Sequence, residues 1–145
     1  MKINVMKAVI VVIGAAVASY LRELLAPLLV LLGAMALDYA TGLVKAYISG
    51  QLSSQVGLAG ILKKLCYMAM VAVGAGVDYL LSAVLAEAGI AEERTLFCGL
   101  LVAIWLIINE LISVLENLAA IGVPGFPFLT KLLERLKGTV ETAHK

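Results

Sequence analysis

The chain has 145 residues, of which 63% are hydrophobic and 14% are charged, and its mean hydropathy is +1.06. Soluble domains are usually about 45–50% apolar, so this composition excludes an ordinary soluble protein. The formal net charge of +1 provides no basic field for nucleic acid, which we do not expect as a partner. We predict an all-α integral membrane bundle of three to four transmembrane helices with a short amphipathic C-terminal helix, in one membrane domain surrounded by lipid.

Four apolar runs, separated by charged residues, are the candidate spans: about 5–21, 24–44, 65–86 and 95–121. About 20 apolar residues cross a hydrocarbon core roughly 30 Å thick. The first run is short between Lys7 and Arg22, and it crosses only if Lys7 snorkels to the interface. It also has the features of a secretory signal, with Ala16-Val17-Ala18 as a cleavage site. Cleavage would leave very little chain before the next span, so we expect a retained anchor.

The segments outside the last three runs predict the topology. Residues 49–64 are rich in glycine and serine and predict an interfacial loop that leads into a short helix. Gly122 and Pro124 end the fourth run, and residues 123–145 form an amphipathic tail with leucines at helical spacing. With four spans, the lysines and arginines of the N-terminus, the loop and the tail fall on one side. The positive-inside rule then predicts a multi-pass protein with both termini in the cytoplasm.

Polar residues inside the spans are the candidate packing or pore-lining residues. Asp38, Thr41 and Gly42 share one helical face of the second span, and Gly74 and Asp78 share one of the third. The fourth span carries a polar set within an arc of roughly 120°: Asn109, Glu110, Ser113, Glu116 and Asn117. No Lys or Arg inside the spans is available to neutralise the acids. Two interpretations remain: protonated acids that hydrogen-bond between helices, or ionised acids that line a wet, cation-tolerant path.

The sequence offers no arrangement of residues that is typical of catalysis. It has no nucleophile and base pair, no phosphate-binding glycine loop and no Cys/His cluster. Cys66 and Cys98 begin antiparallel neighbouring spans and so fall near opposite membrane faces, too far apart for a disulfide. We therefore expect no enzyme activity, no metal and no cofactor.

Two strings, LDYATGLVKAYISGQLSSQVGLAGILKKL and, after the third predicted span, NELISVLENLAAIGVPGFPFL, together resemble the phage lysis and toxin-secretion holin family. The resemblance covers about residues 37–130. Family members often carry more basic residues in the loop and tail than this chain does, and residues 1–22 have no matching motif. The matching positions are Asp38, Gly42, Ser53 or Ser54, Gly57, Gly60, Lys63 or Lys64, Glu110, Ser113, Glu116, Asn117, Gly122 and Pro124.

This resemblance implies a protein that assembles into homo-oligomers in the bacterial cytoplasmic membrane. Such a holin opens pores or lesions that release an endolysin, which causes host cell lysis, or a toxin, and Asp38 would serve assembly. Two alternatives stay open. A small multidrug-type transporter would more naturally carry its essential acid in the first run, which has none here. A non-lytic membrane subunit or antiholin regulator would share the same spans.

Overall fold

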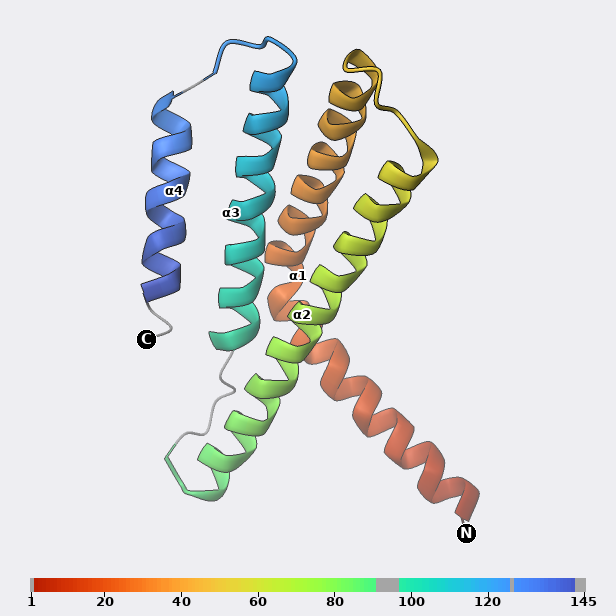
Figure 1. Ribbon diagram of the computed structural model, residues 1–145. Coiled ribbons are helices and arrows are strands. Elements are labelled where there is room, and N and C mark those ends of the chain that lie inside the picture. Colours follow the sequence, from red (N-terminus) through yellow and green to blue (C-terminus); the bar gives the residue numbers. More distant parts are fainter. Residues whose placement is uncertain (1, 91–96, 126, 143–145) are drawn as a thin grey trace.

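The computed structural model describes residues 2–90, 97–125 and 127–142. These residues form four helices (Figure 1): α1 (Lys2–Ile48), α2 (Ser54–Glu87), α3 (Phe97–Ala120) and α4 (Pro127–Thr142). Three segments are long and apolar enough to cross a membrane, and Val5–Ala15 is a shorter apolar stretch; the three are Leu24–Ile48, Ser54–Glu87 and Phe97–Ala120. The predicted all-α membrane bundle with a further C-terminal helix is confirmed.

α3 is the centre of the bundle, because it packs against each of the other three helices, whereas α1 and α2 contact each other only slightly. Figure 1 shows the second half of α1 running beside α3, with α2 crossing in front of α1 and α4 returning along the other side of α3. A small apolar core, formed by Leu31, Met35, Val71 and Leu106, lies where α1, α2 and α3 meet.

Each spanning helix turns one seam of residues inward, with successive members three or four positions apart. Such spacing places the members on one helical face and is typical of helices that pack at small crossing angles. The seam of α1 contains Leu24, Leu28, Leu31, Met35, Asp38, Gly42 and Ala46; that of α2 contains Gly57, Gly60, Lys64, Tyr67, Val71, Gly74 and Asp78; that of α3 contains Gly99, Ala103, Leu106, Glu110, Ser113 and Asn117. All of these residues are buried or half-buried, so apolar and polar groups share the same interfaces.

α1 is longer than the sequence predicts. The predicted spans 5–21 and 24–44 are joined in one continuous helix, without a turn between them. Pro27 lies inside this helix, where its missing N–H removes the hydrogen bond to the carbonyl of residue 23. Figure 1 shows the N-terminal half of α1 leaving the bundle at an angle to the second half. The start of α1 and the turn after Ile48 therefore lie at opposite ends of one helix.

The sequence predicts an interfacial loop over residues 49–64 that leads into a short helix, but in the structure only residues 49–53 lie outside a helix, and the helical part is the start of α2. Ser53 caps α2, because its hydroxyl oxygen accepts a hydrogen bond from the N–H of Val56 at 3.2 Å, and the helix continues from Ser54 through the third predicted span. The glycines in this stretch serve a helix contact. A Cβ atom on Gly57 would lie 3.3 Å from the Tyr39 hydroxyl oxygen, and one on Gly60 would lie 3.5 Å from the Tyr39 ring.

The fourth predicted span, 95–121, corresponds to α3, and its first two residues lie outside the described part of the chain. Gly122 follows α3 with a φ of +86°, a left-handed conformation that glycine adopts without a steric penalty at helix C-termini. Pro124 lies in the link that leads to α4. The tail of the sequence is helical over Pro127–Thr142, as its leucine spacing predicts.

Candidate functional site

Three charged residues occupy the same level of the bundle. Asp38 lies ten residues before the end of α1, Lys64 ten residues after the start of α2, and Glu110 ten residues before the end of α3. The three helix ends concerned lie at one end of the bundle (Figure 1). With a rise of about 1.5 Å per residue, each side chain starts roughly 15 Å below that end. The antiparallel order of the helices thus brings together charges that are distant in sequence.

Lys64 joins the two acids. Its ammonium Nζ lies 2.8 Å from Oδ2 of Asp38 and also donates a hydrogen bond to Oε2 of Glu110. The side chains of Lys64, Asp38 and Glu110 are 14%, 18% and 3% exposed. At such burial an unpaired charge is costly, so both carboxylates depend on this one cation. One ammonium therefore ties α1, α2 and α3 to one another.

Asn117 of α3 extends the same network toward the end of the bundle. Its Nδ2 donates to Oδ1 of Asp38 at 3.1 Å and lies 3.4 Å from the Thr41 hydroxyl oxygen. Lys45 donates in turn to Oδ1 of Asn117 at 3.4 Å. Both oxygens of Asp38 are thus hydrogen-bonded. We call the five residues Asp38, Thr41, Lys64, Glu110 and Asn117 the Lys64 centre.

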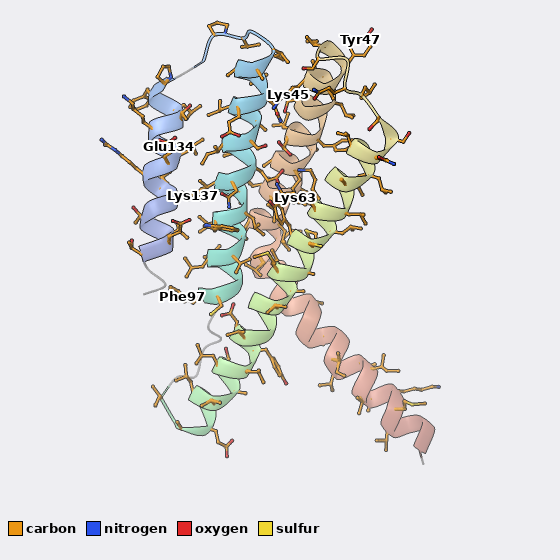
Figure 2. All side chains as sticks on the ribbon, in the orientation of Figure 1. Lys45, Tyr47, Lys63, Phe97, Glu134 and Lys137 are labelled. Carbon is orange, nitrogen blue, oxygen red and sulfur yellow. The ribbon has the colours of Figure 1, made fainter. Side chains whose placement is uncertain are left out.

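An open cavity of about 220 Å³ adjoins the Lys64 centre. Ser113, Gly42 and Lys63 lie along its wall beside Asp38 and Asn117. A Cβ atom on Gly42 would lie 3.6 Å from Nδ2 of Asn117, an ordinary contact distance, so Gly42 packs directly beside this amide. The Lys63 ammonium lies 5.5 Å from the centre of the Tyr67 ring. Figure 2 shows Lys63 and Lys45 in the upper half of the bundle, the half that holds the Lys64 centre.

The expectation that no basic residue neutralises the membrane acids is wrong. It rested on treating residues 49–64 as a loop, which placed Lys64 outside the spans. Because α2 begins at Ser54, Lys64 lies inside the bundle and faces Asp38 and Glu110. The sequence of α2 does indicate that Lys64 faces inward. Gly57, Gly60 and Lys64 continue, at alternating intervals of three and four residues, the helical face that carries Gly74 and Asp78.

Asp78 belongs to a separate contact, near the start of α3. It is fully buried, and its two carboxylate oxygens accept hydrogen bonds from the backbone N–H groups of Cys98 at 2.7 Å and Gly99 at 2.8 Å. These N–H groups lie in the first turn of α3, where a helix offers donors without partners inside the helix. One turn earlier, Gly74 touches the same segment, because its Cβ position is 3.0 Å from Cα of Gly99. Asp78 thus caps α3 from a neighbouring helix.

Replacing Asp78 by asparagine should lower the free energy of unfolding by about 1–3 kcal/mol, because the amide keeps only one acceptor oxygen for two buried N–H donors. Glu87→Gln, at the exposed end of α2, is the matched control and should change it by less than about 0.5 kcal/mol. SDS titration in mixed micelles, followed by circular dichroism, measures both. Equal stability of the two variants would show that Asp78 does not hold α3.

The remaining predicted residues lie apart from the Lys64 centre. Glu116 is exposed and Asn109 is half-buried, and neither is among the residues that line the cavity. The polar set predicted on α3 therefore divides: Glu110, Ser113 and Asn117 belong to the inward seam, and the other two do not. Within the described residues, no group of three or more His, Cys, Asp or Glu side chains is placed to hold a metal ion.

Comparison with known proteins matches residues 6–138 to the bacteriophage holin family. An uncharacterized protein of Halalkalibacterium halodurans is 38% identical over 127 residues, which cover 88% of this chain and 90% of the relative. An uncharacterized protein of Clostridium perfringens is 40% identical over 110 residues, 76% of this chain and 74% of the relative. No solved structure matches the chain.

The family match confirms the resemblance that residues 37–130 indicate, and it extends that resemblance toward the N-terminus. It includes all three segments that are long and apolar enough to cross a membrane and every residue of the Lys64 centre. Holins are a class of membrane proteins without enzymatic activity. The chain belongs to the bacteriophage holin family.

Proposed function

We propose that this protein is a holin: copies of the chain associate in the bacterial cytoplasmic membrane and open lesions through which an endolysin or a toxin passes. The observation that carries the proposal is the family match, which spans residues 6–138 and so includes the three apolar helices and the Lys64 centre that joins them. A lesion needs helices that pack closely with one another and polar groups within the membrane. The chain supplies both.

The surface of the bundle supports the association of copies. Many large apolar side chains of α1 and α2 are exposed on a single chain, among them Leu29, Leu32, Val73 and Leu80, so these faces meet lipid or another protein. Small residues are exposed on the outer faces, and they let helix backbones approach closely. They include Gly33, Ala36 and Ala40 on α1, and Ala69, Ala72 and Gly76 on α2. A Cβ atom on Gly33 or Gly76 would meet nothing within 4 Å, so these faces are open to a neighbouring copy.

In this proposal the Lys64 centre holds each chain together while copies accumulate. Lys64 compensates the acids, so a single folded chain exposes no unpaired carboxylate to lipid at this level. When copies enclose water, the same groups can be hydrated at the wall of the lesion. Asp38 then acts as an assembly residue, and catalysis by this chain forms no part of the proposal.

Regulated expression in a bacterium that also makes a cytoplasmic endolysin tests the holin function. We expect an abrupt fall in culture turbidity, together with loss of membrane potential, at a reproducible time after induction. Lys64→Met should delay or abolish this event at matched membrane abundance, whereas Lys63→Met should preserve it, because Lys63 is exposed and makes no ion pair within the described residues. Cells that keep both turbidity and potential with the unmodified chain would contradict a holin and favour an antiholin-like regulator.

We also propose that the turn over residues 49–53 and the C-terminal helix face the cytoplasm, because the neighbouring segments hold most of the lysines and arginines. Single cysteines at Leu52 and Ile90, in a chain without Cys66 and Cys98, should be labelled only from inside and only from outside, respectively. A third cysteine at Met6 reports on the N-terminus. Labelling from outside agrees with a single crossing by the continuous helix α1, and labelling from inside would require a turn within residues 2–48 that this helix does not contain. The reverse result at positions 52 and 90 would refute the proposed orientation.

A further inference from the structure

α4 packs along α3 through few of its residues. Leu133 is the most buried residue of α4, at 7% exposure. Near the end of the helix, Oε1 of Glu141 accepts a hydrogen bond from Nε1 of Trp105 at 3.4 Å, and the Lys137 ammonium lies 5.9 Å from the centre of the Trp105 ring. Figure 2 shows Lys137 extending from α4 toward α3. We call this arrangement the docked position of α4.

In the docked position, charged side chains of α4 lie at a membrane depth where contact with lipid is energetically costly. Trp105 lies fifteen residues before the end of α3, roughly 22 Å along the helix, and the hydrocarbon core is only about 30 Å thick. Lys137 and Glu141 therefore lie well inside the span of α3. Lys131, Glu134 and Arg135 are exposed on α4 and would point into lipid beside them. Charged side chains at such depths face protein or water.

The leucine face of α4 remains uncovered in the docked position. Leu129, Leu132 and Leu136 are 39%, 41% and 45% exposed. At 100° per residue they fall within one arc of roughly 60°, and Lys131 and Arg135 lie on a different side of the helix. A short helix with one apolar arc and a charged remainder is suited to lie flat at a membrane surface. Because α3 crosses the membrane, α4 cannot lie along α3 and flat on the leaflet at once.

We propose that the leucine face of α4 binds the lipid–water interface of a phospholipid leaflet, and that α4 docks on Trp105 only where that side of α3 faces water. The link between α3 and α4 permits both positions, since Gly122, Pro124 and Gly125 follow the last turn of α3. In a bundle surrounded by lipid, α4 lies on the leaflet and Trp105 is uncovered. In the wall of an open lesion, α4 covers Trp105 and turns its charges toward water. This second step rests on the proposed holin function.

A depth scan of the full chain in sealed phospholipid vesicles separates the two positions. Single cysteines at successive positions from Phe128 to Glu141, in a chain without Cys66 and Cys98, carry nitroxide labels whose contact with lipid-soluble oxygen and with a water-soluble nickel complex is compared. On the leaflet, depth should oscillate with the 3.6-residue helical period. Neighbouring positions provide matched controls: labels at Leu132 and Leu136 should be in lipid, and those at Lys131 and Arg135 in water.

A depth that increases steadily from Phe128 to Glu141 would show that α4 stays along α3, and it would overturn the proposal. Water exposure at every position would overturn it as well, because the leucine face would then bind no lipid. The result is independent of the lysis assay. An oscillating depth in a chain that does not lyse cells refutes only the holin function, and a steady increase in a chain that does lyse them refutes only this inference.

Discussion

Replacing Lys64 by methionine should lower the free energy of unfolding by about 3–5 kcal/mol, because the substitution leaves two carboxylates in the bundle without their shared cation. Methionine keeps most of the length and apolar stem of lysine, so the lost charge dominates the effect. Asp38 retains its hydrogen bond from Asn117, whereas Glu110, whose side chain is 3% exposed, is the more costly charge to leave unpaired. SDS titration in mixed micelles, with helix content as the signal, measures the change.

Lys63→Met is the matched control for this prediction. Lys63 precedes Lys64 in the same helix, but its side chain is exposed, its ammonium lies 5.5 Å from the centre of the Tyr67 ring, and it forms no ion pair within the described residues; its attraction to Asp38 and Glu110 acts at longer range. A cation–π contact at an exposed site contributes about 0.5–1 kcal/mol. A Lys64→Met variant as stable as Lys63→Met would show that the ion pairs do not hold the bundle together.

Removing the acids together with the lysine should recover most of the lost stability. A triple variant, Lys64→Met with Asp38→Asn and Glu110→Gln, leaves no charge in the Lys64 centre, and the amide oxygen at position 38 can still accept the hydrogen bond from Asn117. Replacing a complete buried ion-pair group is often neutral, whereas breaking it is costly. Recovery in the triple variant would assign the loss in Lys64→Met to unpaired charge, and continued instability would assign it to packing.

The sequence predicts the membrane class from its apolar runs, and helical spacing predicts a few of the polar and small residues of the inward seams. Asp38 and Gly42 on α1, and Gly74 and Asp78 on α2, share faces by helical spacing alone, and the structure places each pair on the seam of its helix. Spacing within one helix does not identify the partner on another helix. Asp38 meets Lys64 and Asn117, whereas Asp78 meets backbone N–H groups, so two similar acids have different contacts.

The loop predicted over residues 49–64 shows why residue types alone do not identify the Lys64 centre. Gly57 and Gly60 resemble loop residues in a composition count, but in the structure they lie in α2 and pack against Tyr39 of α1. That contact depends on an aromatic residue of another helix, and local sequence does not contain it. The seam spacing that joins Gly57, Gly60, Lys64 and Gly74 is local, and it favours a helix over this stretch.

In the tail and the first helix, too, local sequence predicts helical structure but not the contacts or the boundaries of the helices. Leucine spacing predicts that residues 127–142 form a helix, but the contact of Lys137 and Glu141 with Trp105 depends on how the link turns after Gly122. In α1, Arg22 marks the predicted boundary between two spans, yet a charged residue at a helix surface does not interrupt backbone hydrogen bonding. The helix therefore continues through this position.

Gly74→Ala should separate α2 from the start of α3 and lower the free energy of unfolding by about 1–3 kcal/mol. The new Cβ atom would lie 3.0 Å from Cα of Gly99 and 3.2 Å from both the carbonyl oxygen of Cys98 and the N atom of Gly99. These are backbone atoms of one helix, so no side chain can rotate away, and the helices must move apart. The same movement lengthens the hydrogen bonds from Cys98 and Gly99 to Asp78, which adds to the loss.

Gly76→Ala is a control with the opposite expected sign. Gly76 lies two residues further along the same helix, is exposed, and its Cβ position meets nothing within 4 Å. Alanine loses less conformational freedom than glycine in a helix, so this substitution should raise the free energy of unfolding by about 0.5–1 kcal/mol. Both variants add one methyl group to α2, and SDS titration of monomeric chains in micelles compares them directly. If both were stabilised, the close contact between Gly74 and Gly99 would not be a constraint, and the seam of α2 would tolerate larger residues at that level of the bundle.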